Sequence, residues 1–290
     1  MDHRFTGPSF TLGIEEELMI VDEEQYDLVN AIESLLEDAP EGAIKPELME
    51  SVLEISTDPC DSAAEAGRQL RALRTQVLRS AAERGLTIGS AGTHPFAMWE
   101  DQRIVSRDRY REIVSALRFV ARQELIFGMH VHVGIEGAER AIHVADGMRV
   151  HLPVLLALSA NSPFWRAAPT GLQSTRMPIF RAFPRVGVPP AWESWESYAE
   201  QIDFMTRTGV MEDYTFLWYD VRPHPNLGTV EVRVCDSQTR LEHTIGLAAL
   251  IQAMARELCV HFDEGRELSH YPWQMLDENK WLAARHGLDA

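Results

Sequence analysis

Four short segments of this chain alternate apolar with ionisable residues, and this pattern strongly limits how the chain can fold. The segments read TLGIEEELMIV (11–21), VLEIS (52–56), GMHVHVGI (128–135) and TVEVRVCD (229–236). Successive side chains of a β-strand point to opposite faces, so each segment predicts a strand with one apolar and one polar face. Helices can cover only the apolar face of such a sheet. The polar face then carries Glu15, Glu17, Glu54, His130, His132, Glu231 and Arg233.

Each strand taken alone also fits an antiparallel sheet with a wet face, on which Glu and His bind nothing. The four strands together favour a binding surface, because Lys, Thr and Gln, which are usual on solvent faces, are scarce at these positions. Glu16 falls on the apolar side and needs a buried partner there, a bulge or a place at the sheet edge. Cys235 shares the side of Glu231 by the same alternation, so contact of its thiol with metal or substrate stays open.

Longer stretches with apolar residues at helical spacing predict the helices of an α+β fold. The clearest runs from Asp61 to Gly85, with Ser62 and Glu65 as a capping box and Gly85 as the expected C-terminal cap. We found no repeat, low-complexity segment or long linker, so we expect a single domain over residues 1–290. The other predicted helices cover residues 107–126, 139–160, 195–207, 241–262 and 277–288.

Composition excludes several classes of protein. The chain has 27 basic and 44 acidic residues, a net charge of −17, whereas a duplex-binding protein needs a cationic face. It has neither a Walker-type phosphate loop nor a dinucleotide fingerprint, so a nucleotide would bind by other means. The three cysteines are too few for a disulfide framework. The N-terminal residues form no apolar leader, and the sequence has no run of 18 apolar residues. We therefore expect a cytoplasmic protein with no membrane span.

A carboxylate-rich sheet face is suited to hard divalent cations. Carboxylates two residues apart on a strand stand roughly 6.5–7 Å apart, a spacing that suits two cations better than one shared proton. Magnesium or manganese prefers oxygen ligands, tolerates a histidine and keeps positions open for phosphate and water. Zinc fits less well without a Cys cluster or an HExxH motif. A solvated acidic surface remains the alternative interpretation. Arg176, Arg181 and Arg233 could each bind a carboxylate or phosphate through two parallel hydrogen bonds.

Seven motifs, in a fixed order, closely resemble the glutamate–cysteine ligase type 2 family, also called carboxylate–amine ligases, of the glutamine synthetase-like superfamily. The resemblance covers roughly residues 10–290. The ordered set is specific, although each motif alone is weak. The motifs are GIEEELMIVD, KPELMESVLEIST, AGTHPF, GMHVHVGI, ANSPFW, TGLQSTRMPIFRAFPR and GTVEVRVCDSQT.

The resemblance implies a glutamine synthetase-like catalytic core, in which a curved antiparallel sheet carries magnesium on its polar face and helices on its apolar face. It also implies ATP-dependent amide-bond formation through an acyl phosphate. We therefore expect Mg²⁺ (or Mn²⁺) as cofactor and ATP as co-substrate. The other expected partners are small molecules, an amino-acid carboxylate and an amine, with no nucleic acid and no membrane. A homodimer is left open.

Carried over by motif, the resemblance also assigns roles to individual residues. The expected metal ligands are Glu15, Glu17, Glu54, His130, Glu231 and Glu47, the last on a segment that could be helix or loop. The expected catalytic residues are Glu231 and Arg233, the arginine facing the transferred phosphate. Substrate binding is assigned to Arg176, Arg181 and His132, although His132 could also hold metal or nucleotide. Nucleotide binding is assigned to Arg233, Lys280 and Arg285.

The end of the chain departs from the family, which we expect to continue for several dozen residues beyond ENKWLAARHGLDA. We therefore expect one catalytic domain without its C-terminal segment. This leaves a second hypothesis, a member that binds nucleotide but is catalytically impaired or inactive. A third hypothesis, a metal-dependent hydrolase on the same sheet face, would act without ATP. No residue pattern selects the amine.

Overall fold

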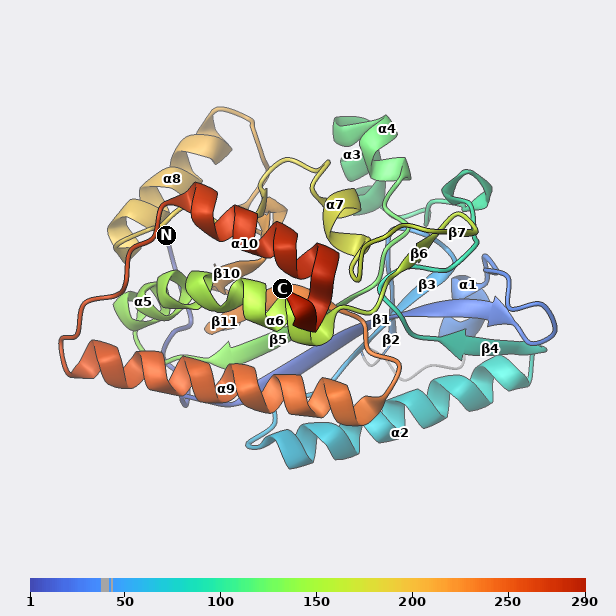
Figure 1. Ribbon diagram of the computed structural model, residues 1–290, viewed down its shortest axis with the longest axis horizontal. Coiled ribbons are helices and arrows are strands. Elements are labelled where there is room, and N and C mark those ends of the chain that lie inside the picture. Colours follow the sequence, from blue (N-terminus) through green and yellow to red (C-terminus); the bar gives the residue numbers. More distant parts are fainter. Residues whose placement is uncertain (38–41, 43) are drawn as a thin grey trace.

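The computed structural model describes residues 1–37, 42 and 44–290. At its centre lies a twisted antiparallel sheet with the strand order β10-β11-β5-β1-β3-β2, and β4 pairs with the far end of β1 (Figure 1). Its strands are β1 (Leu12–Asp22), β2 (Ile44–Pro46), β3 (Val52–Ser56), β4 (Leu86–Gly89), β5 (Gly128–Gly134), β10 (Val221–His224) and β11 (Thr229–Asp236). Two-residue strands form two further pairs, β6 (Phe164–Trp165) with β7 (Ala168–Pro169), and β8 (Val186–Gly187) with β9 (Trp218–Tyr219).

Alternation along the strands divides the sheet into an apolar and a polar face, as predicted. On β1, Ile14 and Leu18 are buried in the main hydrophobic core, while Glu15 and Glu17 lie on the other face. All strand pairs of this sheet are antiparallel. The expected antiparallel sheet with one apolar and one ionisable face is therefore confirmed.

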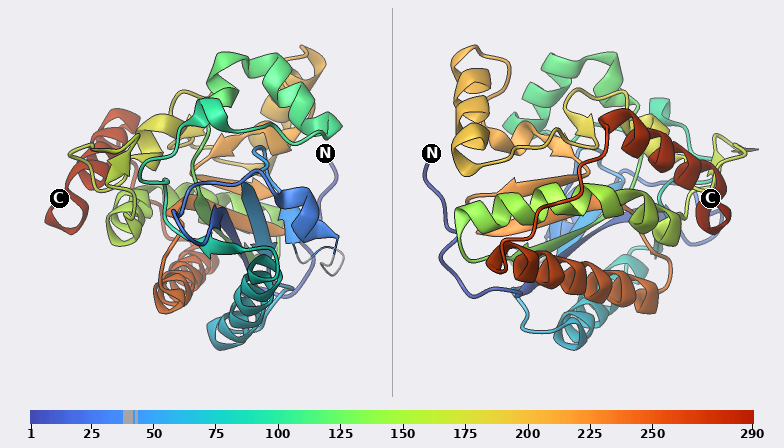
Figure 2. Two further views of the ribbon diagram at one scale, coloured as in Figure 1. Left: turned by 90° about the vertical axis from the view of Figure 1, so that its right-hand side faces the viewer. Right: turned by 60° about the vertical axis from the view of Figure 1, so that its left-hand side comes forward.

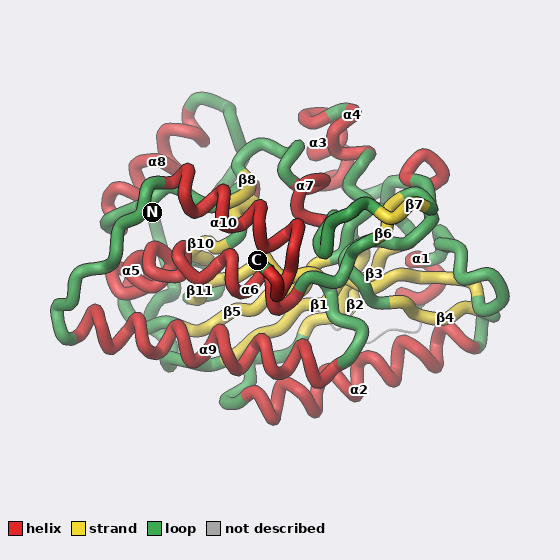
Figure 3. The backbone as a smooth tube through the Cα atoms, in the orientation of Figure 1, coloured by secondary structure: helices red, strands yellow, loops and turns green. Residues whose placement is uncertain are grey.

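Helices surround the sheet in two groups (Figure 3). The helices α2, α5 and α9 pack together and against the apolar side, whereas α3 and α4 lie on the opposite side of the sheet (Figure 2). The α-helices are α1 (Ile32–Leu36), α2 (Ala63–Ala82), α3 (Asp108–Leu117), α4 (Phe119–Arg122), α5 (Ala138–Met148), α6 (Leu152–Ser159), α7 (Arg176–Phe180), α8 (Trp195–Arg207), α9 (Leu241–Asp263) and α10 (Trp273–His286). Single 3₁₀ turns cover Trp99–Asp101, Arg149–His151, Tyr214–Phe216 and Gly287–Asp289.

The helix predictions hold where capping and periodicity agree. The Ser62 hydroxyl accepts a hydrogen bond from the Glu65 amide at 3.3 Å, and Gly85 adopts a positive φ of 66° after α2. The predicted helix over 107–126 is instead two short helices, because Arg118 adopts a φ of 54° between them. The predicted helix over 139–160 contains a 3₁₀ turn before Pro153, which has no N–H to continue the helical hydrogen bonds.

Glu16 on the apolar side is neutralised by a buried partner. Arg74 of α2 donates from Nη2 to Oε1 of Glu16 at 2.7 Å and from Nε to Oε2 at 2.8 Å. Thr244 of α9 donates its hydroxyl to the same carboxylate at 2.7 Å. Glu16 of β1 is therefore hydrogen-bonded to both α2 and α9, the helices that cover the apolar face of the sheet. Of the three sequence-level possibilities for Glu16, the buried partner is the one that holds.

In the part of the chain that the structure describes, two helical stretches are long and apolar enough, by length and composition, to cross a membrane: Ala138–Ser159 and Leu241–Asp263. The first has 61% of its apolar window buried in the protein, and the second 33%. Both pack inside the domain, since α5 contacts α9 and both contact strands of the central sheet. We therefore interpret them as core helices.

Candidate active site

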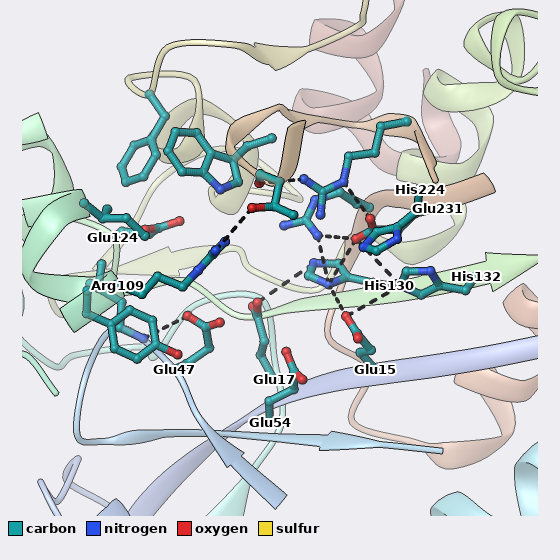
Figure 4. Close-up of a pocket in the computed structure, with 18 residues that line it drawn as sticks. Glu15, Glu17, Glu47, Glu54, Arg109, Glu124, His130, His132, His224 and Glu231 are labelled. Atoms are coloured by element: carbon teal, nitrogen blue, oxygen red, sulfur yellow. Dashed lines mark hydrogen bonds and ion pairs between the residues drawn. The ribbon is translucent and has the colours of Figure 1, made fainter. Parts of the chain in front are cut away.

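A pocket of about 190 Å³ opens on the polar face of the sheet. The strands provide its floor, which consists of Glu15, Glu17, Glu54, His130, His132, Glu231 and Arg233 (Figure 4). We call this set the acidic floor. Its walls come from α3, from the loop after β2 that carries Glu47 and from the segment around Trp218.

Strand register brings these residues together from distant parts of the chain. Glu15 pairs with His130 across β1 and β5, and Glu17 pairs with Glu54 across β1 and β3. Glu231 of β11 pairs with His132 of β5. Residues directly opposite each other in antiparallel strands have Cβ atoms about 5 Å apart. The register therefore places four carboxylates and two imidazoles within reach of shared cations.

One group of these side chains has the spacing of a metal site. Glu15, His132 and Glu231 each offer a ligand atom, and these atoms lie within 4.8 Å of one another. The Nε2 atom of His132 is buried without a hydrogen-bond partner, at 3.8 Å from both Glu15 Oε2 and Glu231 Oε1. Its Nδ1 lies 2.9 Å from the Thr229 hydroxyl, which orients the ring. This donor set fits a divalent cation.

His130 lies beside a second group of carboxylates. Its Nδ1 is 3.2 Å from Glu15 Oε2, and its buried, unpartnered Nε2 is 3.9 Å from Glu17 Oε1. Glu47 also lines the pocket here, on a segment that follows β2 as a loop. Burial, together with the charges of Glu17 and Glu54, raises the pKa of Glu47 to about 8. A cation here would lower that pKa and remove the repulsion.

Glu54 is held by a lysine of the neighbouring strand. Lys45 of β2 donates from Nζ to Glu54 Oε1 at 3.0 Å and to the Ser56 hydroxyl at 2.9 Å. Burial and the charge of Glu15 nevertheless raise the pKa of Glu54 to about 7. The structure thus places this expected metal ligand at the floor, with one oxygen already bonded.

Glu231 lies between two arginines. Arg222 of β10 donates from Nε to Glu231 Oε2 at 2.6 Å, and Arg233 donates from Nη1 to Oε1. Burial alone would raise the pKa of Glu231, but the charges of Arg222 and Arg233 outweigh it and hold the pKa well below its usual value. Arg222 also donates to the Thr215 carbonyl at 2.9 Å. Glu231 thereby fixes the guanidinium of Arg233 at the floor.

Sequence reasoning missed several groups that line the pocket. Arg222 and His224 occupy alternate positions of β10, a signal that the sequence does contain. Pro223 between them argues against a strand, yet it is tolerated because β10 is an edge strand of the sheet. Arg109 of α3 and Glu124 also line the pocket, and no strand alternation marks either of them.

Arg176, expected to hold a substrate carboxylate, lies behind the floor. It is 2% exposed and borders a small recess of about 30 Å³, shared with Glu17, Glu47 and Arg233. Its guanidinium donates to the carbonyls of Val234 and Arg233 at 3.4 and 3.3 Å, whereas its Nε is buried without a partner.

Three other expected binding residues are not brought to the pocket. Arg181 is half-exposed and pairs with Asp277 of α10 at 2.5 Å. Lys280 is buried in an ion pair with Asp220, also at 2.5 Å, and Arg285 is exposed on α10. Helix α10, which carries Lys280 and Arg285, packs mainly against α6. The ion pairs of Arg181 and Lys280 join this helix to the rest of the domain. Their assigned substrate and nucleotide roles gain no support from this geometry.

The expectation that Cys235 shares the face of Glu231 is wrong. A register shift between Val232 and Cys235 inserts one extra residue in β11, so Cys235 pairs with Met129 on the apolar side. Cys235 is fully buried, and burial raises the pKa of its thiol to about 12. The same shift turns Asp236, which pairs with Gly128, to the face of the sheet that carries His130. There its carboxylate accepts hydrogen bonds from the hydroxyls of Ser162 and Ser174.

Comparison with known proteins identifies the family of this chain. Residues 11–290 match the family model of glutamate-cysteine ligase family 2. This chain belongs to that family. A Rubrobacter xylanophilus protein with the provisional name glutamate–cysteine ligase 2-1 is 45% identical over 293 residues, covering 100% of this chain and 77% of that protein. A Solibacter usitatus protein with the provisional name glutamate–cysteine ligase 2 is 43% identical, covering 97% of this chain and 74% of that protein.

Solved structures show the same fold. Glutamate–cysteine ligase from Francisella tularensis, solved with AMP, has a TM-score of 0.67 and 16% identity over 99% of this chain and 73% of its own. A bifunctional glutathione synthetase from Pasteurella multocida has a TM-score of 0.70 and 16% identity, over 96% of this chain and 42% of its own. The family member described here therefore has the expected glutamine synthetase-like fold.

The crowded floor predicts how the stability of this glutamate–cysteine ligase family member depends on pH. Glu47 and Glu54, with pKa values of about 8 and about 7, bind protons more tightly when folded than when unfolded. Between about pH 6.5 and 8 the folded state therefore holds more protons, and the free energy of unfolding falls as pH rises. We expect a loss on the order of 2 kcal/mol across this window in metal-free protein.

The histidines do not reverse this sign. Burial lowers the pKa of five histidines, to about 4 for His224, and the others are His94, His130, His143 and His151. Their opposite effect fades as pH rises above the ordinary histidine pKa of about 6.5. Glu124, whose pKa burial raises well above its usual value, adds to the loss of stability. His132 acts with the glutamates: burial opposes the shift, but the charge of Glu231 raises its pKa. Urea unfolding at pH 6.5 and pH 8 with a chelator measures the loss, which added Mn²⁺ should reduce. Constant or rising stability in the chelator would contradict the prediction.

Proposed function

We propose that this chain is an ATP- and Mg²⁺-dependent ligase that joins a glutamate-like carboxylate to an amine, acting in the cytoplasm. Membership of glutamate-cysteine ligase family 2 supports the reaction class. The observation that carries the proposal is the pair of buried imidazole nitrogens, on His130 and His132, that have no partner and face floor carboxylates. Such a donor set is suited to cations that bind a polyphosphate.

Residues of the acidic floor would hold the metal. Glu15, His132 and Glu231 form one candidate site. Glu17 and His130, with Glu47 of the pocket wall, provide donors for another, and Glu54 lies opposite Glu17 across β1 and β3. Bound Mg²⁺ would supply charge neutralisation for the phosphates of ATP. His132 thus moves from the expected substrate-binding set to the candidate metal ligands, one of the alternatives left open for it.

The arginines act on the transferred group in this proposal. The carboxylate oxygen of the first substrate attacks the γ-phosphorus of ATP, which gives an acyl phosphate and ADP. The amine then attacks the acyl carbon, phosphate leaves, and the amine nitrogen loses a proton. Arg233, which is oriented by Glu231, is positioned at the floor to stabilise negative charge on the phosphate. The buried Arg176 supports a substrate carboxylate through the adjoining recess.

Phosphate release tests the proposal directly. The purified chain with Mg²⁺ and ATP is expected to release phosphate only when both a carboxylate donor such as L-glutamate and an amine such as L-cysteine are present. A panel of amino acids and amines then identifies the preferred pair. ATP binding without phosphate release across the whole panel would contradict the ligase proposal and indicate a non-catalytic member of the family. Turnover without ATP would indicate a hydrolase instead.

A further inference from the structure

The pocket contains an arginine that is not committed to any acidic or carbonyl partner. Within the described residues, the arginines that line it are Arg109, Arg222 and Arg233. Both Arg222 and Arg233 are bonded to Glu231. Among the described residues, Arg109 makes one hydrogen bond, a long one of 3.2 Å from Nη1 to the Thr215 hydroxyl, and its guanidinium stacks over Phe216 at 5.2 Å. A neutral hydroxyl carries no charge to pair with that of Arg109, whose guanidinium stays open to a ligand.

Helix α3 aims Arg109 into the pocket. Arg109, Tyr110 and Ile113 share one face of this helix and all line the pocket. Figure 4 shows the side chain of Arg109 extending into it. The Tyr110 hydroxyl donates to the Pro46 carbonyl at 2.6 Å, and this bond ties α3 to the strand that precedes Glu47. Arg111 points elsewhere, since it pairs with Asp108 of the same helix. The orientation of Arg109 is therefore set by the packing of α3.

The position of Arg109 complements the acidic floor. Arg222 and Arg233 bind Glu231 on the side of the pocket formed by β11, whereas Arg109 extends into the pocket from the wall formed by α3. The wall near Arg109 also carries the aromatic side chains of Phe183 and Trp218. Glu47 and Glu124 also line the pocket. Their negative charges would repel a bound anion, so the anion needs a positively charged group beside it. Arg109 is exposed, so a ligand can reach it without displacing protein groups.

We propose that Arg109 is a substrate-binding residue that grips an oxyanion by bidentate hydrogen bonds. The oxyanion is either the carboxylate of the amino-acid substrate or the terminal phosphate of ATP, which share this chemistry. The inference rests on the proposed function, because it names a contact of the same pocket. In the carboxylate case, Arg109 would favour substrates that carry this carboxylate over neutral analogues.

Separate binding titrations of wild type and variants test this assignment without any need for turnover. The probes are L-glutamate and a non-hydrolysable ATP analogue, each titrated with Mn²⁺ present. Arg109→Gln is expected to weaken binding of one probe about tenfold or more, because a charged hydrogen-bonding partner is lost. Arg109→Lys, which keeps the charge but loses the fork, should restore part of the affinity. The matched control, Arg111→Gln on the same helix, should leave both affinities within about twofold.

The probe that weakens identifies the oxyanion. Selective weakening of glutamate assigns Arg109 to the substrate carboxylate, and selective weakening of the analogue assigns it to the phosphate. Affinities unchanged for both probes in Arg109→Gln would overturn the inference. So would equal weakening of both probes with a lowered melting temperature, since that indicates a general structural role. If the wild type binds both probes but releases no phosphate, the ligase proposal fails while these titrations still decide the role of Arg109.

Discussion

Replacement of Glu231 by Gln is expected to abolish activity and to lower the free energy of unfolding by about 3 kcal/mol. The carboxylate is 1% exposed and bonds both Arg222 and Arg233. Without its negative charge, the buried Arg222 would keep only carbonyl acceptors, and Arg233 would lose the group that orients it. Removal of one partner from a buried ion pair leaves the other charge uncompensated, and this cost dominates the effect.

Urea unfolding together with phosphate release measures both parts of this prediction. Glu136→Gln is a matched control, because Glu136 is exposed just beyond β5, and it should change neither quantity appreciably. Stability of Glu231→Gln within about 0.5 kcal/mol of wild type would show that Glu231 does not balance the arginines. Since the fold itself should weaken, loss of metal binding in this variant alone would not establish Glu231 as a ligand.

Glu15→Gln is the cleaner probe of the metal site, and it is expected to weaken Mn²⁺ binding on the order of 100-fold. Glu15 contacts His130 and His132 and has no arginine or lysine partner within the described residues. Burial would raise the pKa of Glu15, but hydrogen bonds and charges of His130 and His132 hold it well below its usual range. Because Glu15→Gln leaves no arginine or lysine unpaired, it should destabilise the metal-free protein less than Glu231→Gln does. Loss of a charged ligand from a three-donor set should remove most of the affinity for the cation.

Thermal unfolding at increasing Mn²⁺ measures this prediction. At a concentration 100 times its dissociation constant, the ion stabilises wild type by about 2.7 kcal/mol, whereas a 100-fold weaker variant gains only about 0.4 kcal/mol. Glu24→Gln, an exposed change just past β1, should respond like wild type. Equal stabilisation of the Glu15 variant and wild type would remove Glu15 from the ligand set.

Strand alternation alone was sufficient to predict the acidic floor. The side-chain period of a strand is local, so Glu15 and Glu17 could be placed on one face without knowledge of any neighbour. The same argument failed at Cys235, because a bulge depends on the pairing partner and adds a residue that no local period reveals. It also passed over Arg222 and His224, because the proline between them hides an edge strand.

Family motifs identified the family but did not place every residue. Arg181, Lys280 and Arg285 lie in segments that resemble the family, yet the structure pairs the first two with Asp277 and Asp220, away from the pocket. A motif records which residue types occur in order, whereas these two ion pairs depend on how α10 packs against the rest of the domain. Arg109 of α3 and Glu124, which follows α4, likewise reach the pocket because of how their segments pack in the folded chain.

The sequence by itself determined the two faces of the sheet, the ionisable chemistry of one face and the family. Tertiary structure alone decided which of these groups meet. Register sets Glu15 beside His130 and Glu231 beside His132, and helix packing buries Arg74 against Glu16. The physical reason is one of range: strand period acts between adjacent residues, whereas charge pairing acts between side chains that only the folded chain brings within a few ångströms.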